Sequence, residues 1–290
     1  MIPKEIADSL SGYFASSGNP SFTIISSSSL SGGCINNVSR LTTSAGDFCI
    51  KFNKRDLFPE MFEGEADGLG ILKKAGEIRV PGVVCPGYAG TFSYLLLEFI
   101  DPGRKIPSFY SDFGRSLARM HRHTADYFGL DHDNYMGSLR QFNTKHSDWI
   151  SFFVEERLEK QISLSRNYFS SSDISAFKRL YNRLGELLPE EPPGLLHGDL
   201  WGGNYMVSPE GKACLIDPAV YYGHREIDIA MTTLFGGFEG DFYASYNEEY
   251  PLEKGWKDRL DIFNLYPLLI HLNLFGSGYL GSIERIVRKF

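Results

Sequence analysis

The sequence contains few cysteines, no long apolar run and no excess of basic residues. Its four cysteines, Cys34, Cys49, Cys85 and Cys214, are far apart and form no C-x-x-C pair. This spacing argues against a zinc site or a disulfide framework. No apolar stretch reaches the length of a membrane-spanning helix, and the first residues lack the apolar core of a signal peptide. We therefore expect a cytoplasmic protein with free thiols and no membrane partner.

Positive charge is outweighed by negative charge. The chain has 29 lysines and arginines against 36 aspartates and glutamates, which gives a net charge of −7. Nucleic-acid binding usually requires a basic stripe, so we expect no nucleic-acid partner. Apolar residues, in contrast, make up 42% of the 290 residues, enough to form the core of one large domain or of two lobes.

The most informative motif is residues 196–204, followed by residues 215–218. Asn204 lies five residues after Asp199, and Asp217 lies eighteen residues after Asp199. An aspartate can orient a hydroxyl and accept its proton, and amide and carboxylate oxygens are ligands that Mg²⁺ tolerates. The spacing is that of the catalytic loop and metal-binding aspartate of protein kinases. We interpret Asp199 as catalytic, and Asn204 and Asp217 as magnesium ligands.

The residues between Asn204 and Asp217 predict a β-hairpin. Two short apolar segments flank the sequence Ser-Pro-Glu-Gly at residues 208–211, which suits a type I turn. Such a hairpin would return Asp217 beside Asn204, so that both could reach one ion. Alternatively, Asp199 and Asn204 merely cap turns, as these residue types often do. The three residues with a hairpin between them favour the catalytic interpretation.

The N-terminal part predicts a nucleotide-binding lobe. Strands are expected at residues 22–25, 38–42, 47–53, 80–84 and 93–100. The turn between the first two strands contains Gly32 and Gly33, whose backbone N–H groups could approach phosphate oxygens. Lys51 lies on the third strand, and Glu65 lies in the apolar stripe of a helix expected at residues 59–74. Because an unpaired carboxylate there would be destabilising, we expect Lys51 to pair with Glu65 and to hold nucleotide phosphates.

The last of these strands ends in the turn Asp101-Pro102-Gly103. We assign Glu98, Phe99 and Ile100 to a hinge whose backbone binds adenine, with lobes at residues 1–100 and 101–290. Helices are expected over residues 113–121, 149–162, 173–188, 226–234 and 257–275. The expected fold class is α+β, with a bilobal protein-kinase-like fold: a small antiparallel-sheet lobe with one key helix, and a larger, mainly helical lobe.

Some residues near these motifs have two interpretations each. Trp201 could stack on a substrate sugar or its amine substituent, or anchor the loop. His271 lies among leucines and could be a core histidine or face a substrate cleft. Cys34, in the glycine turn, could be a reactive thiol or a small residue that fills a gap. We expect His197 and Asp228 to brace the catalytic loop through its backbone.

Together these segments resemble the aminoglycoside phosphotransferase and choline kinase group, and more closely the fructosamine kinase (ketosamine-3-kinase) family. The closer resemblance rests on residues 32–35, 128–137, 197–204, 217–228, 234–238 and 271–276. Gly202 departs from the pattern, because the family often has serine there. The resemblance implies ATP-dependent phosphorylation of the 3-hydroxyl of a ketosamine, free or bound to a protein. The product sheds its amine, so this activity is a form of deglycation.

The same resemblance implies that Asp199 is the base, that Asn204 and Asp217 hold magnesium, and that Lys51 and Glu65 orient the phosphates of ATP. Two alternatives stay open. One is a kinase of another small hydroxyl substrate, such as an aminoglycoside, choline or a sugar. The other is a nucleotide-binding regulator without catalysis, against which the complete set of Asp199, Asn204 and Asp217 argues. We expect a monomer or weak dimer.

Overall fold

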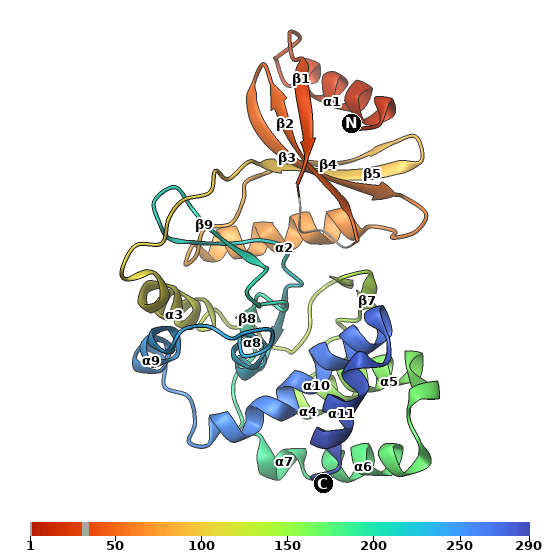
Figure 1. Cartoon of the computed structure of the whole chain (residues 1–290), viewed down its shortest axis with the longest axis vertical. Coiled ribbons are helices and arrows are strands. Elements are labelled where there is room, and N and C mark those ends of the chain that lie inside the picture. Colours follow the sequence, from red (N-terminus) through yellow and green to blue (C-terminus); the bar gives the residue numbers. More distant parts are fainter. Residues whose placement is uncertain (1, 31–34) are drawn as a thin grey trace.

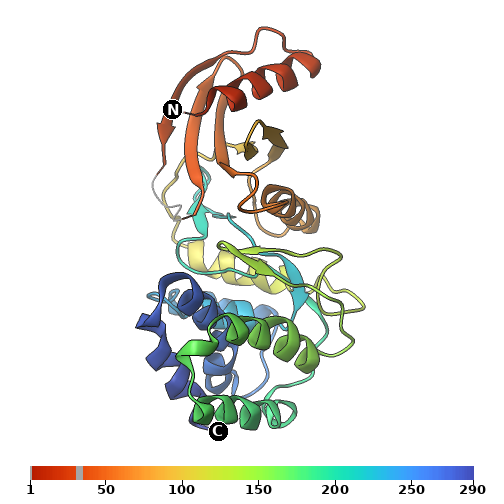
Figure 2. The ribbon, with the colours of Figure 1, turned by 90° about the vertical axis from the view of Figure 1, so that its right-hand side faces the viewer.

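The computed structural model describes residues 2–30 and 35–290, so Gly32, Gly33 and Cys34 lie outside the described part of the chain. Its N-terminal part is a five-stranded antiparallel sheet in the order β1-β2-β3-β5-β4. The elements of this part are α1 (Lys4–Ser16), β1 (Ile24–Ser29), β2 (Asn37–Thr43), β3 (Gly46–Lys54), α2 (Met61–Ala75), β4 (Val83–Ala89) and β5 (Phe92–Glu98). Figures 1 and 2 show this part stacked on a mainly helical part.

The alternation of β3 gives the sheet two apolar faces. Ile50 and Phe52 point to one face, where they join a cluster with Leu10 of α1. Cys49 and the β5 residue Leu95 belong to the opposite cluster, which includes the buried side of α2. The sheet lobe therefore has the expected key helix, α2, and a second helix, α1, that was not predicted. Only two residues of α1 are buried, which is too weak an apolar pattern to predict a helix.

The four serines at residues 26–29 fall between the strands expected at residues 22–25 and 38–42, and their implied place in the turn was wrong. They continue β1, in which Ser27 pairs with Leu41 and Ser29 with Ser39 of β2. β1 is an edge strand whose side chains are mostly exposed, so only its backbone needs a partner and hydroxyl side chains are tolerated. The predicted strand at residues 80–84 also begins later, at Val83.

The C-terminal part is mainly helical, with short two-stranded sheets set into it. Its helices are α3 (Phe109–Met120), α4 (Trp149–Phe152), a π-helical turn (Phe153–Leu158), α5 (Glu159–Leu164), α6 (Ser171–Tyr181), α7 (Leu184–Leu187), α8 (Glu226–Met231), α9 (Gly240–Glu249), α10 (Trp256–Phe275) and α11 (Leu280–Val287). Its strands are β6 (Asn134–Met136), β7 (Leu139–Gln141), β8 (Gly194–Leu196), β9 (Tyr205–Val207), β10 (Ala213–Leu215) and β11 (Tyr221–Gly223). The helix expected at 113–121 begins earlier, and the one expected at 173–188 is broken after Tyr181.

The predicted hairpin between Asn204 and Asp217 is present as β9 and β10. The Gly211 N–H donates to the Ser208 carbonyl over 2.8 Å and closes the turn. The hairpin also contacts the segments that precede β4 and follow β5. The Leu215 N–H donates to the Arg79 carbonyl, and the Gly103 N–H donates to the Val207 carbonyl. An apolar core runs from α2 and β5 through α3 to the segment around Leu200, and so supports the hairpin from both halves. Within the described residues, no helix has the length and hydrophobicity to cross a membrane.

The packing of α3 against α9 gives a test of this core. A Cβ at Gly114 of α3 would lie 2.2 Å from the Phe242 carbonyl oxygen, whereas one at Gly12 of α1 would meet nothing within 4 Å. Gly114→Ala should therefore lower the free energy of unfolding by about 1–3 kcal/mol through overpacking. Gly12→Ala should raise it by about 0.5–1 kcal/mol, because alanine favours a helix over glycine. Urea denaturation of both variants measures the contrast, and equal effects would contradict the close packing.

Candidate active site

A cavity of about 190 Å³ lies where the sheet lobe meets the helical lobe. Seven of the predicted site residues line it: Lys51, Glu65, Asp199, Trp201, Asn204, Asp217 and His271. They come from β3, α2, the segment before β9, the end of the β9–β10 hairpin and α10. The fold thus gathers at one place side chains that lie far apart in the sequence.

The expected ion pair between Lys51 and Glu65 is present, with Nζ and Oε1 2.5 Å apart. Lys51 Nζ also bonds to Asp217 Oδ1, so one ammonium bridges two carboxylates. Burial alone would lower the pKa of Lys51, but the charges of Asp217 and Glu65 outweigh it and hold the pKa above its usual value. Lys51 therefore stays charged although it is only 6% exposed.

Asp228 lies on α8 and fixes the backbone of the loop that carries Asp199. The carboxylate of Asp228 accepts the His197 N–H over 2.8 Å and the Gly198 N–H over 2.9 Å. Gly198 has φ = 84°, and a Cβ there would lie 2.0 Å from the Ala219 carbonyl oxygen. His197 places Nε2 3.0 Å from the Ile216 carbonyl, and Nδ1 accepts the Asp199 N–H. The bracing expected of His197 and Asp228 is therefore found.

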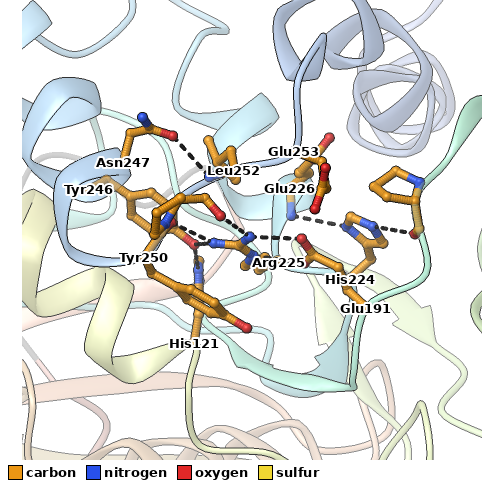
Figure 3. A network of polar contacts seen from close by, with 12 residues as sticks. His121, Glu191, His224, Arg225, Glu226, Tyr246, Asn247, Tyr250, Leu252 and Glu253 are labelled. Carbon is orange, nitrogen blue, oxygen red and sulfur yellow. Dashed lines mark hydrogen bonds and ion pairs between the residues drawn. The ribbon is translucent and has the colours of Figure 1, made fainter.

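Asp228 is also in contact with a network of buried polar groups. Figure 3 shows the part of this network that includes His121, Arg225 and Tyr246. His121 Nε2 lies 3.2 Å from Asp228, and its Nδ1 lies 2.7 Å from the Tyr246 hydroxyl. The Tyr246 hydroxyl in turn accepts a bond from Arg225, which pairs with Glu191 through two nitrogens. This series of hydrogen bonds from Asp228 to Glu191 therefore links the loop that carries Asp199 to α9 and to the segment before β8.

The group of Glu191, His224 and Glu226 has the residue types of a metal site, but its ligand atoms are occupied. Glu191 pairs with Arg225, and Glu226 pairs with Arg259. His224 Nε2 lies 3.2 Å from the Pro189 carbonyl, and Nδ1 accepts the Glu226 N–H. Burial lowers the pKa of His224 to about 4, so the imidazole is neutral. This group is a structural charge network.

Asp199 lies at the floor of the cavity, where Asn204 orients it. Asn204 Nδ2 donates both to the Asp199 carbonyl, over 2.9 Å, and to Asp199 Oδ2, over 2.8 Å. Burial raises the pKa of Asp199 to about 7; the Asn204 hydrogen bond lowers it, and the charges of Asp217 and Asp228 raise it. A carboxyl group that titrates near neutral pH is suited to accept a proton from a substrate hydroxyl.

The side chains of Asn204 and Asp217 fit a hard divalent cation. Because the Asn204 amide nitrogen bonds to Asp199, its Oδ1 is directed away from that carboxylate and can act as a ligand. The Ile216 N–H donates to the Asn204 carbonyl over 3.0 Å, which brings Asp217 next to Asn204 as the hairpin predicted. The cavity holds three carboxylates, on Glu65, Asp199 and Asp217, against one ammonium, and this excess of negative charge favours a cation.

The predicted hinge residues do not line this cavity. The Glu98 carboxylate pairs with Arg79 at 2.8 Å and accepts the Gly82 N–H. The Phe99 ring lies 4.3 Å from the Arg40 guanidinium, and Ile100 is buried. These side chains have structural contacts, so a role in adenine binding would rest on their backbone alone and stays a prediction. Gly32 and Gly33 lie outside the described residues.

The β6–β7 hairpin also lines the cavity and was missed as part of the site. Asn134 Nδ2 donates to the Val220 carbonyl, and Gln141 Nε2 donates to the Ala219 carbonyl, so the hairpin holds the segment after Asp217. Tyr266 of α10 donates to Gln141 Oε1 over 2.9 Å. In the sequence, Asn134 and Gln141 are isolated polar residues. Their partners are backbone carbonyls about 80 residues away, so no local pattern indicates a role in the site.

The two hydrogen bonds that Asp228 accepts predict that Asp228→Asn strongly lowers the stability of the protein. Asp228→Asn would turn an amide N–H₂ toward backbone N–H groups and leave a buried donor unpaired, which should lower the free energy of unfolding by about 1–3 kcal/mol. Asp261→Asn is the matched control, because Asp261 is half-exposed and, among residues 2–30 and 35–290, pairs only with Lys289. It should change stability by no more than about 0.5 kcal/mol. Urea denaturation compares the two, and equal stability of both variants would contradict the bracing role.

Comparisons with known proteins show the family of this chain. A ketoamine kinase candidate from Enterococcus faecium is 41% identical over 265 residues, covering 89% of this chain and 93% of its own. The chloroplastic protein-ribulosamine 3-kinase of Arabidopsis thaliana is 40% identical, over 90% of this chain and 81% of its own. The crystal structure of a fructosamine-3-kinase candidate from Haemophilus somnus 129PT superposes with a TM-score of 0.86 and 30% identity, covering 98% of this chain and 96% of that one. The sequence profile of the fructosamine kinase family matches residues 7–290, and the chain belongs to this family.

Proposed function

We propose that this protein is a kinase that transfers the γ-phosphoryl group of ATP to the 3-hydroxyl of a ketosamine. Membership of the fructosamine kinase family supports the reaction class. The observation that carries the proposal is the meeting of Lys51, Asp199, Asn204 and Asp217 around one cavity. These are the residue types that phosphoryl transfer needs for holding phosphates, accepting a proton and binding a metal.

Asp199 is the proposed catalytic base. A ketosamine hydroxyl within hydrogen-bond distance of Asp199 would be oriented toward the γ-phosphoryl group and would pass its proton to the carboxylate. The Asn204 amide holds Asp199 Oδ2 from one side, so the carboxylate keeps one orientation without movement during the reaction. Because Asp228 fixes the backbone on which Asp199 stands, this geometry exists before the substrate binds.

Lys51 is the proposed ligand of the α- and β-phosphates, with Glu65 as the group that orients it. Asn204 Oδ1 and the Asp217 carboxylate would hold magnesium, whose chemistry is to neutralise the charge of the β- and γ-phosphates. Because Asp217 would then bind the metal, the ammonium of Lys51 would contact Glu65 and the phosphates of the nucleotide. We further propose that Gly32 and Gly33 contact phosphates, that the backbone of residues 98–100 binds adenine, and that the lobes are residues 1–100 and 101–290.

The similar proteins also indicate the class of acceptor. The names of the two curated relatives point to ketoamines and to protein-bound ribulosamines. Trp201 and His271 line the same cavity as Asp199 and would contact the sugar or its amine. An aminoglycoside or choline kinase shares the phosphate chemistry, so only acceptor turnover separates these functions.

An ADP-release assay with a fructosamine, a ribulosamine, kanamycin and choline tests the proposal. We expect turnover with at least one ketosamine and none with the other two acceptors. Asp199→Asn should lower kcat by about 10²–10⁴-fold, the usual contribution of a general base, while nucleotide affinity stays within about twofold. The exposed Asp126→Asn is the control and should keep full activity. Turnover of kanamycin or choline alone, or full activity of Asp199→Asn, would refute the assignment.

The pKa of Asp199 predicts a pH profile. With a pKa of about 7, the carboxyl group becomes protonated as the pH falls and can no longer accept the proton of the substrate. The kcat/KM for a ketosamine should therefore be level above about pH 8 and fall tenfold per pH unit well below pH 7. The residual kcat/KM of Asp199→Asn should lack this inflection. An unchanged inflection in that variant would assign the titration to another group.

A further inference from the structure

A continuous group of aromatic side chains leads from the cavity to the protein surface. Trp201, His271 and Phe275 line the cavity, and Phe235 and Tyr279 extend the group outward. The Phe235 ring lies 5.7 Å from that of Trp201 and 4.8 Å from that of His271. His271 is 5.5 Å from Phe275 and 5.1 Å from Tyr279. We call these five side chains the aromatic shelf.

The backbone holds Phe235 in a strained position. Phe235 has φ = 54°, which is unusual for a bulky residue, and the two glycines that follow it also have positive φ. This conformation costs roughly 1–2 kcal/mol. The ring is 46% exposed, and Phe275 is 55% exposed, so burial of these rings does not explain the strain. Strain of this kind is typical of ligand-binding positions.

The inner end of the aromatic shelf is set by the catalytic loop itself. Trp201 follows Asp199 by two residues, and its ring lies directly over Gly203. A Cβ at Gly203 would be 2.3 Å from the indole. The glycine thus allows the indole to lie close to the backbone between Asp199 and Asn204. A molecule whose hydroxyl reaches Asp199 is therefore brought near the face of Trp201.

The rings of the aromatic shelf favour a cation with an apolar substituent. Burial lowers the pKa of His271, and the hydrogen bond between Nδ1 and the Pro267 carbonyl, 2.7 Å away, offsets only part of that effect. Aromatic faces attract cations, and they also pack against carbon chains.

We propose that the aromatic shelf binds the amine side of the ketosamine: its protonated secondary amine and the carbon chain that the amine carries. This inference rests on the proposed function. In a ketosamine, the nitrogen and the 3-hydroxyl are attached to the same short carbon chain, so a hydroxyl at Asp199 places the nitrogen near Trp201. The substituent then extends along Phe235 and Phe275 toward solvent. The enzyme therefore selects acceptors by their amine as well as by their sugar.

Two fructosamines that differ only in their amine test the outer part of the aromatic shelf. One is formed from methylamine, which ends near Trp201, and the other from benzylamine, whose ring reaches Phe235. Phe235→Ala and Phe275→Ala should each raise KM about tenfold for the benzylamine adduct and less than threefold for the methylamine adduct, in line with the usual worth of an aromatic contact. The kcat should stay within twofold, because Asp199 is untouched. Phe235→Tyr should restore the KM.

The controls separate this proposal from the proposed function. Ile25→Ala removes a side chain that is 68% exposed on β1 and should change neither KM. If the wild-type protein phosphorylates both adducts but Phe235→Ala changes both KM values equally, or neither, the aromatic shelf is refuted and the kinase function stands. If the wild-type protein phosphorylates no ketosamine, both proposals fail.

The charge of the amine is tested by the benzyl ether of fructose, which places an uncharged oxygen where the benzylamine adduct has nitrogen. The wild-type KM for the ether should be about tenfold higher than for the amine, since the ether loses the attraction between a cation and an aromatic face. An equal KM for both compounds would remove the cation from the proposal and overturn it.

Discussion

The position of the ammonium group of Lys51 is the constraint on which the rest of the site depends. This one charge, buried on β3, contacts Glu65 from α2 and Asp217 from the end of the β9–β10 hairpin. A buried ammonium without partners would be strongly unfavourable, and so would the buried Glu65 carboxylate alone, whereas the Asp217 carboxylate is half-exposed. The sheet and the helix must therefore come together for the charges of Lys51 and Glu65 to be tolerated, and the hairpin adds Asp217 as a second partner of the ammonium. The same arrangement creates the cavity.

A second constraint fixes the loop that carries Asp199, and it acts through the backbone. Asp228 accepts two consecutive N–H groups, and the turn between them requires a positive φ at Gly198. Because the carbonyl of Ala219 approaches so closely, no side chain fits at position 198. The glycine of the His-Gly-Asp motif is thus explained by packing and backbone conformation. The next residue, Asp199, is thereby held with its side chain in the lining of the cavity.

Local sequence patterns were sufficient to predict those parts of the site that depend on a single strand, helix or hairpin. The alternation of β3 placed Lys51 opposite the face of Ile50, the apolar stripe of α2 included Glu65, and the Ser-Pro-Glu-Gly turn predicted the hairpin that is found. A salt bridge could be expected between the first two residues because each needed a partner.

Other features could not be predicted because their partners are set only by the fold. The contact of Lys51 with Asp217 joins residues 166 positions apart. Arg157 is fully buried in a π-helical turn, where it donates to Asn143 and to the Phe142 carbonyl and packs on Tyr221. A charged residue in a sequence gives no sign of such backbone partners. The edge strand of serines was missed for the opposite reason, since an exposed strand needs no apolar pattern.

Backbone strain is concentrated around the cavity. In residues 2–30 and 35–290, the non-glycine residues with positive φ are Glu60, Asp217 and Phe235. Glu60 caps α2 next to Met61, which lines the cavity; Asp217 lines it directly; and Phe235 packs on Trp201 at its mouth. Each position stores of order 1–3 kcal/mol, which the surrounding packing must offset. A core selected only for stability would favour glycine or asparagine at such positions. Asp217 lines the cavity itself, and Glu60 and Phe235 each lie next to a residue that lines it, so the strained positions follow the boundary of the cavity.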